Sequence, residues 1–250
     1  EILSGLVGSE MCIRDSSDPA LQQTRAKILS PLGAAVSKST EKAEVLACTD
    51  DLSPNTLSRT NQSIRVQDMT LETERLLLRP WQATDAADLY EYAKDARVGP
   101  IAGWPPHTSV ENSADIIRTV FNHPEVYAVE LKENRRAVGC VGILIGSNSN
   151  FEISEQEGEI AYWIGVPYWG KGLTPEAVRE VMRHAFENLN LKALWCGYFA
   201  NNIQSYAAQS KCGFRFHHTE ENKYNQFLQD YRTEHISRIT YQEWLDHTKE

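Results

Sequence analysis

One stretch of this chain, residues 158–176, limits the possible folds more than any other, because an extended segment, a glycine-bearing loop and a helix start follow one another there. From Glu159 to Gly165, alternate side chains form two faces that are both mostly apolar. Side chains alternate along a strand, so this segment is predicted to be a strand covered on both faces. Pro167 ends the pattern, since proline has no N–H to donate to a strand ladder. We therefore expect the rest of the chain to be organised around a central strand.

The loop after this strand has the composition of an anion-binding turn. Residues 170–172 (Gly-Lys-Gly) let a bare backbone approach a ligand, and Thr174, Pro175 and Glu176 follow in the order of a helix N-terminus, with Thr174 as the cap. Unpaired N–H groups and the helix dipole both favour an anion at such a place. The loop lacks the Lys-Ser/Thr pair of a mononucleotide phosphate loop and the three-glycine dinucleotide fingerprint. An ordinary strand-to-helix turn would have the same residues.

A second motif follows at the matching distance. Residues 202–205 read Asn-Ile-Gln-Ser and residues 211–214 read Lys-Cys-Gly-Phe, so that Asn202 can cap a short helix and Gly213 can stop it. Together with the central strand and the glycine loop, this helix resembles the GNAT acyl-CoA N-acetyltransferases, and most closely the RimJ/RimL-type branch. The resemblance covers nearly all of residues 69–250. Pro167 departs from it, because the usual superfamily loop has Gln or Arg three residues before its first glycine.

The predicted order of elements is strand, two helices, three strands, helix, strand, helix and two strands, which is an α/β arrangement. It matches the GNAT fold, a mixed and mostly antiparallel central sheet of about seven strands flanked by about four helices. A capping box at residues 108–111 is expected to open the second helix, with Val110, Ala114, Ile117 and Phe121 buried, and residues 98–107 are expected to form a loop. The predicted strands are 75–79, 126–131, 137–145, 159–165, 193–199, 214–217 and 234–239, and the main helix is 175–188.

The first 68 residues differ in composition from the rest of the chain. Residues 17–68 are polar and contain no Trp, Tyr or Phe, so they cannot bury enough apolar surface to offset chain entropy, and disorder is expected. Weak helical patterns at 21–32 and 40–47 would need a partner surface. Residues 1–16 resemble translated sequencing-adapter DNA. We expect an N-terminal extension, disordered or artefactual, over residues 1–68 and one acetyltransferase domain over residues 69–250, with a natural start at Met69.

Composition excludes several classes of function. The formal net charge of −9 and the pI near 5.3 argue against a nucleic-acid partner and are compatible with an amine substrate. Five cysteines without paired spacing suggest neither a disulfide framework nor a zinc site, and the histidines lack metal-ligand spacing. No apolar run approaches the roughly 20 residues of a membrane span. We expect a cytoplasmic protein, monomeric or homodimeric, with no metal and no membrane partner.

The resemblance implies acetyl-CoA as co-substrate and an amine as acceptor. It places a carbonyl-polarising backbone N–H near residues 164–166, as in an oxyanion hole. It makes Ser205 the candidate proton donor to the leaving thiolate, or else a cofactor ligand, since Gln209 stands where other branches have a tyrosine. Glu159 is the candidate proton acceptor, unless it is a solvated glutamate at a strand end. The residues expected to contact the cofactor are Ile164, Gly165, Val166, Trp169, Gly170, Lys171, Gly172, Leu173, Thr174, Asn202 and Ser205.

The acceptor is expected to enter between the 99–107 part of the loop and the segment after Gly213, with Trp104, His107 and Tyr162 as substrate-binding residues. Acidic residues on the far wall, Glu220, Glu221 and Asp230, would favour a protonated amine. The predicted reaction is acetyl transfer to a primary amine, with a peptide or protein N-terminus preferred on the RimJ/RimL resemblance. A polyamine or aminoglycoside acceptor, a non-catalytic acyl-CoA sensor, and an interaction domain whose loop binds nothing are the alternatives.

The composition of residues 1–68 generates a first prediction. A chain that begins at Met69 should remain soluble and keep the melting temperature of the full chain, because the extension has too little apolar surface to join a core. Differential scanning calorimetry of both chains measures this. A clearly lower melting temperature for the shorter chain would make the extension part of the core.

Overall fold

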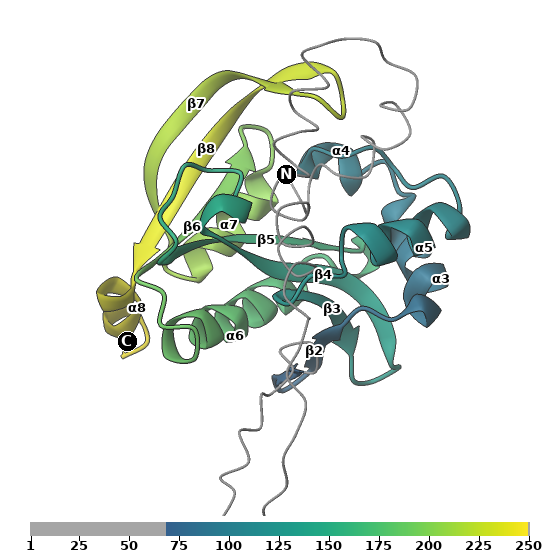
Figure 1. Cartoon of the computed structure of the whole chain (residues 1–250), viewed down its shortest axis with the longest axis horizontal. Helices are drawn as coiled ribbons and strands as arrows, with labels where there is room; N and C mark the ends of the chain where they lie inside the picture. The colour runs from purple at the N-terminus through teal and green to yellow at the C-terminus, as the bar shows by residue number, and fades with distance from the viewer. Residues whose placement is uncertain (1–68, 250) are drawn as a thin grey trace, which may run out of the picture. The chain divides into compact units, whose positions relative to one another are not determined.

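The computed structural model describes residues 69–249, so the predictions for residues 1–68 lie outside the described part (Figure 1). One mixed sheet of eight strands runs in the order β1-β2-β3-β4-β5-β6-β8-β7. The strands are β1 (Leu71–Glu72), β2 (Leu76–Pro80), β3 (Val126–Leu131), β4 (Arg136–Ile145), β5 (Glu157–Ile164), β6 (Ala193–Phe199), β7 (Arg215–Asn225) and β8 (Asp230–Thr240). The predicted α/β architecture and the central place of the 159–165 strand are confirmed.

Six α-helices belong to residues 69–249: α3 (Ala86–Ala93), α4 (Gly99–Ala102), α5 (Val110–Thr119), α6 (Leu173–Glu187), α7 (Ile203–Lys211) and α8 (Tyr241–His247). Short 3-10 turns precede α3, follow β4 and follow β5: η2 (Ala83–Asp85), η3 (Gly146–Asn148) and η4 (Val166–Tyr168). The long helix α6 packs on β4 and β5, while α3 and α5 pack against each other and α3 covers β4 (Figure 1).

The one parallel pair of the sheet determines its shape. β5 and β6 pair only at Glu157 with Ala193, Gly158 with Leu194, and Glu159 with Trp195. Beyond these positions β5 stays paired with β4 as far as Ile164, and β6 stays paired with β8 as far as Phe199. The two strands therefore part after Glu159, and the sheet opens between them.

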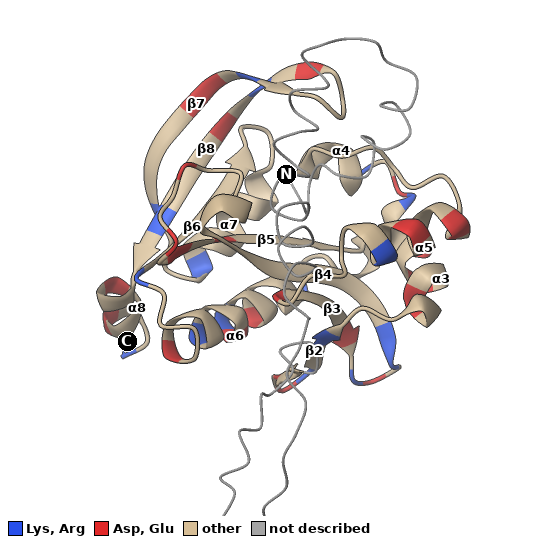
Figure 2. Cartoon of the chain, viewed as in Figure 1, with Lys and Arg blue, Asp and Glu red and all other residues tan. Residues whose placement is uncertain are grey.

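The core explains why α6 lies flat on the sheet. Its apolar side is buried and includes Val178, Val181, Met182 and Ala185, which are at most 1% exposed. Its other side carries Arg183 between Glu180 and Glu187, and Figure 2 shows both signs of charge along this helix. Apolar residues recurring every three or four positions give this two-sided helix.

Helix starts differ from the predictions at two places. α6 begins at Leu173, two residues before the expected Pro175. Gly172 adopts a left-handed φ of 75° and serves as the N-cap instead of Thr174. The cap of α5 is Ser109, whose hydroxyl accepts from the N–H of Asn112, so the capping box predicted for residues 108–111 is wrong and the cap lies one residue later. In both cases two nearby residues could cap, and backbone geometry decided between them.

The burial of α5 and the loop before it also differ from the predictions. The buried face of α5 contains Ser113, Ile116 and Ile117, whereas Val110 is 38% exposed, because α3 packs on that face. The segment 98–107, expected as a loop, contains the one-turn helix α4, which ends at Gly103 with a left-handed φ of 95°.

The last two strands are much longer than the predicted 214–217 and 234–239. β7 and β8 form a long antiparallel hairpin that ends with Asn225 opposite Asp230. Its distal half is held by backbone pairing and has polar, largely exposed side chains. It therefore has no apolar alternation by which its strands could be predicted.

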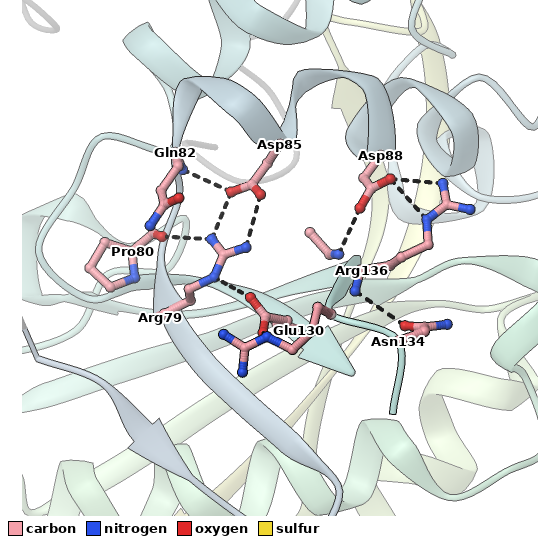
Figure 3. Close-up of polar contacts among 10 residues, drawn as sticks. Arg79, Pro80, Gln82, Asp85, Asp88, Glu130, Asn134 and Arg136 are labelled. Carbon is pink, nitrogen blue, oxygen red and sulfur yellow. Dashed lines mark hydrogen bonds and ion pairs between the residues drawn. The ribbon is translucent and has the colours of Figure 1, made fainter. Parts of the chain in front are cut away.

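A buried charge cluster joins the first strands to the start of α3 (Figure 3). The guanidinium of Arg79 contacts Asp85 at 2.7 Å and Glu130 at 2.5 Å, and both carboxylates are less than 10% exposed. Asp85 also accepts from the backbone N–H of Gln82 at 2.8 Å. Removing one partner of such a buried pair typically costs on the order of 3–5 kcal/mol, because the other charge stays buried. The cluster thus ties β2, η2 and β3 together.

A second buried pair lies between α6 and β3. His184, fully buried, places Nε2 at 3.1 Å from a carboxylate oxygen of Glu125, which also accepts from the hydroxyl of Tyr127. Burial opposes the charged imidazole, but the hydrogen bonds with Glu125 and Asn188 outweigh it and raise the pKa of His184. Burial likewise opposes the carboxylate, yet the contacts with His184 and Tyr127 leave the pKa of Glu125 lowered.

These shifts generate a pH prediction. The contribution of His184 is full below its ordinary pKa of 6.5 and is lost as pH rises through the raised value. That of Glu125 is present above its ordinary 4.5 and is lost as pH falls through the lowered value. His184→Gln should therefore lower the melting temperature more at about pH 5.5 than at about pH 8.5.

For a domain of this size, each kcal/mol of lost stability lowers the melting temperature by roughly 2–4 °C. His247→Gln, which changes an exposed histidine of α8, is the matched control and should show no such pH difference. Equal destabilisation by His184→Gln at both pH values would mean that the imidazole contributes only by packing.

Candidate functional site

The glycine loop connects β5 to α6 through two left-handed residues. Gly170 has a φ of 73° and Gly172 a φ of 75°, a conformation that side chains other than glycine rarely adopt. The indole N–H of Trp169 donates to the carbonyl of Ile164 at 2.8 Å and fixes the start of the loop on the strand end. A Cβ added at Gly170 would meet no atom within 4 Å, so the outer side of the loop is open.

The N-terminus of α6 points its donors at this open side. No oxygen within residues 69–249 accepts from the N–H groups of the loop and first turn, which are those of Gly170, Lys171, Gly172, Leu173 and Thr174. Arg75 crosses behind them, bonded to the carbonyl of Lys171 at 2.9 Å and to Glu176 at 2.6 Å. Free N–H groups and the positive end of the helix dipole make this an anion site that fits a phosphate.

A groove runs from this loop to α7, and we call it the loop groove. Its walls come from α4, the end of β5, the glycine loop and α7. It is lined by residues that include Ile101, Tyr162, Ile164, Tyr168, Trp169, Gly170, Gly172, Leu173, Thr174, Asn202, Ser205 and Lys211.

A second hollow, the inner cavity, lies where β5 and β6 part and continues under the β7–β8 hairpin. It is lined by residues that include Trp104, Asn150, Glu159, Ala161, Tyr162, Gly197, Phe199, Ser205, Lys223, Tyr224, Phe227 and Glu234. The hairpin is fastened to α4 above it, because Asn225 donates to the carbonyl of Gly103 at 2.9 Å and Arg232 donates to that of Pro100 at 2.5 Å.

The two hollows meet at a hydroxyl pair. Ile101, Ala102, Tyr162, Trp163, Asn202 and Ser205 line both. The hydroxyls of Tyr162 and Ser205 are 3.0 Å apart, and the amide of Gln209 donates to Ser205 Oγ at 3.3 Å. Burial raises the pKa of Tyr162 well above 10, so this phenol keeps its proton. A neutral proton donor therefore stands at the junction.

Strand geometry also places backbone donors at the junction. The N–H of Gly165 donates to the carbonyl of Val138 in β4 at 2.8 Å. Successive N–H groups of a strand point to opposite edges, so the N–H of Ile164 points away from β4, toward the opening between β5 and β6. This is the direction in which an oxyanion would need a donor.

Glu159 lies in the cavity wall, 6% exposed, with its carboxylate held by donors. Oε2 accepts from the hydroxyl of Ser149 at 2.9 Å and from the backbone N–H of Asn150 at 2.7 Å, and Oε1 accepts from the side-chain amide of Asn150 at 2.9 Å. Glu159 thereby anchors the segment between η3 and β5 that begins with Ser149 and Asn150. It is not the solvated glutamate at a strand end that was its alternative.

Most of the predicted site residues line one of the two hollows, but four do not. Gly165, Val166 and Lys171 of the predicted cofactor set and His107 of the predicted substrate set are absent from the residues lining either hollow. His107 is 5% exposed and bonded to the hydroxyl of Ser113 at 2.8 Å, and burial lowers its pKa to about 4. It supports the segment that carries Trp104, which does line the inner cavity.

The acidic wall expected from Glu220, Glu221 and Asp230 is provided by another residue. None of these three lines the inner cavity; Glu220 contacts Lys223 at 2.8 Å and Asp230 contacts Arg232 at 2.8 Å. The carboxylates that line the cavity are those of Glu159 and of Glu234, and Glu234 is paired with Lys223. The predicted strand began at Glu234, so no earlier residue of an alternating pattern indicated on which face of the sheet its side chain lies.

Comparison with known proteins agrees with this geometry. The acetyltransferase (GNAT) domain family matches residues 75–215. The chain belongs to the GNAT acetyltransferase family. Over 133 residues it is 31% identical to the uncharacterised N-acetyltransferase p20 of Bacillus licheniformis, covering 50% of this chain and 70% of that one. It is 26% identical to the uncharacterised N-acetyltransferase YnaD of Bacillus subtilis, covering 59% and 83%.

Solved GNAT structures have the same fold. Mycobacterium smegmatis RimJ, in complex with CoA-disulfide, superposes with a TM-score of 0.58 at 20% identity, over 71% of this chain and 90% of that one. The ribosomal-protein-S5-alanine acetyltransferase of Vibrio fischeri gives 0.56 at 20% identity, over 71% and 99%. These structures show that the chain has the GNAT fold, and acyltransferase activity is that of the family.

Two further structural findings concern residues 69–249. In this part of the chain, no three His, Cys, Asp or Glu side chains are placed to hold a metal ion together. None of the helices described there has the length and apolar surface needed to cross a bilayer.

The glycine loop generates a prediction about coenzyme A. Gly172→Asp should weaken coenzyme A binding by roughly tenfold or more, because it adds a negative charge beside the free N–H groups at the helix N-terminus. Isothermal titration calorimetry with coenzyme A measures the affinity.

Gly172→Ala is the control, since it introduces the same left-handed strain without the charge. A smaller loss in Gly172→Ala than in Gly172→Asp would separate charge from strain. Unchanged affinity in Gly172→Asp would place the pyrophosphate elsewhere.

Proposed function

We propose that this GNAT protein transfers the acetyl group of acetyl-CoA to a primary amine, and that the amine is the N-terminus of a peptide or protein. The observation that carries the proposal is the meeting of two hollows at Ser205 and Tyr162, beside the opening between β5 and β6. One hollow begins at an anion site and the other is lined by aromatic rings and carboxylates. A cofactor and an acceptor can therefore approach one junction from opposite sides.

The chain has residues for each requirement of this reaction. The N–H groups of residues 170–174 would hold the pyrophosphate, with Asn202 and Trp169 along the same groove. Acetyl-CoA would supply an acyl thioester at the junction. The N–H of Ile164 would stabilise negative charge on the acyl oxygen.

In this proposal, Ser205 supplies a proton to the departing sulfur. Its Oγ accepts a hydrogen bond from the side-chain amide of Gln209 and lies 3.0 Å from the hydroxyl of Tyr162. The serine proton can therefore pass to the sulfur in the loop groove while the phenol donates a hydrogen bond to Oγ. Tyr162 thus contributes the hydroxyl that the tyrosine of other branches would supply at position 209. The predicted role of Glu159 as proton acceptor remains a prediction.

The peptide acceptor is supported by the names of the neighbours, which include a RimJ and a ribosomal-protein-S5-alanine acetyltransferase. A cytoplasmic location and a monomeric or homodimeric state remain predictions from the sequence.

A panel of acceptors tests the proposal: hexapeptides with a free N-terminal serine or alanine, spermidine, and kanamycin, with release of free coenzyme A as the measurement. The peptides should be acetylated at their α-amine, as verified by mass spectrometry. Ser205→Ala should lower kcat by roughly 10²-fold, the usual contribution of a positioned proton donor. Ser210→Ala, an exposed serine on the same helix, should leave kcat unchanged.

Three outcomes contradict parts of the proposal. Turnover of spermidine or kanamycin without peptides would overturn the peptide acceptor. Coenzyme A binding without turnover of any amine would make the protein an acyl-CoA sensor. Equal kcat in Ser205→Ala and the unmodified chain would remove Ser205 from the chemistry.

A further inference from the structure

The inner cavity contains two carboxylates, and they differ in how fully they are bonded. Both oxygens of Glu159 accept hydrogen bonds from Ser149 or Asn150. Glu234, on β8, has one described partner, the ammonium of Lys223, which contacts Oε2 at 2.9 Å. Within residues 69–249, no donor contacts its other oxygen, Oε1. Glu234 lines the cavity and therefore keeps, at Oε1, an acceptor position without a described donor.

A glycine makes room for this carboxylate. Gly197 of β6 lies directly beneath it, and a Cβ at that position would come within 2.3 Å of Glu234 Oε1. The side chain of Glu234 is 15% exposed, and Phe151 Cζ lies 3.0 Å from the same Cβ position of Gly197. Burial raises the pKa of Glu234, and the contact with Lys223 opposes that rise. The cavity thus holds an incompletely satisfied carboxylate close to the opening between the strands.

The partner of Glu234 is itself a primary ammonium group. Lys223 Nζ lies 2.9 Å from Glu234, 2.8 Å from Glu220 and 5.3 Å from the centre of the Phe151 ring. Burial opposes its charge, but the two glutamates outweigh burial and raise the pKa of Lys223. A charged amine already occupies the position that an amine acceptor would need.

We infer that Glu234 is the carboxylate that receives the ammonium group of the acceptor, and that Lys223 is an internal cation that occupies this position until the acceptor displaces it. The inference rests on the proposed function, since it requires an amine acceptor in the inner cavity. The group recognised by Glu234 is a primary ammonium, carried on a chain slender enough to pass the aromatic side chains that line the inner cavity.

Glu220 gives Lys223 a second partner, so the displacement of Lys223 from Glu234 can occur with little loss of free energy. It lies nearer the surface, with a side chain 40% exposed, and already contacts Lys223. When an acceptor ammonium takes over Glu234, Lys223 keeps Glu220 as its partner, so no buried charge is left alone. The arrangement also excludes anions from the cavity and favours positively charged acceptors over neutral ones of the same shape.

Steady-state kinetics of three variants test the inference, with the serine hexapeptide and with spermidine as separate acceptors. Glu234→Gln should raise KM for the amine about tenfold or more, because it removes a charge-assisted hydrogen bond, and should leave KM for acetyl-CoA within about twofold. Lys223→Met should lower KM for the amine, because Glu234 then has no internal competitor. Glu221→Gln is the matched control, because it removes an exposed charge from β7, the strand that carries Lys223.

The inference and the proposed function fail in different ways. If the unmodified chain acetylates an amine and Glu234→Gln has the same KM for it, Glu234 does not receive the acceptor, although the proposed function stands. If Lys223→Met raises KM as much as Glu234→Gln, Lys223 supports the acceptor site and does not compete for it. If the unmodified chain turns over neither amine, the proposed function fails first. Melting temperatures of all variants verify that each is folded.

Discussion

The early end of the parallel pairing between β5 and β6 is the constraint on which the rest of the site depends. Pairing stops at Glu159 and Trp195, and both strands continue with other partners. The backbone groups that would have bonded across the gap are then available at its edges. The glycine loop, α7 and the β7–β8 hairpin all meet this gap, so a groove and a cavity share one junction at Ser205 and Tyr162.

Charge is used differently in the body of the fold and in the cavity. Arg79 is bonded to two buried carboxylates (Figure 3). His184 is bonded to Glu125 and Asn188, so both buried groups have their partners. In the cavity, Glu234 keeps one oxygen without a described donor. A satisfied buried network makes an arrangement rigid, whereas an incompletely satisfied group remains able to bind another partner.

The hairpin shows how an element with little core can still shape a site. The distal half of β7 and β8 buries few side chains, yet Asn225 and Arg232 attach it to α4 through two carbonyl groups. This places Lys223 and Glu234 against the cavity instead of in open solvent. In the inference proposed above, specificity for the acceptor depends on a part of the chain that contributes little to the apolar core.

The sequence by itself determined the order of the elements, the central strand, the glycine loop, the cap at Asn202 and the family, because these depend on local periodicity and on residues such as Gly172 and Gly213. It could not choose between caps one or two residues apart, so Thr174 and Thr108 were assigned wrongly. Only the tertiary structure decided that His107 is buried away from both hollows and that Tyr162 joins Ser205. It also decided that Glu234 faces the cavity, because such pairings depend on strand register and on contacts between distant segments, which local patterns do not encode.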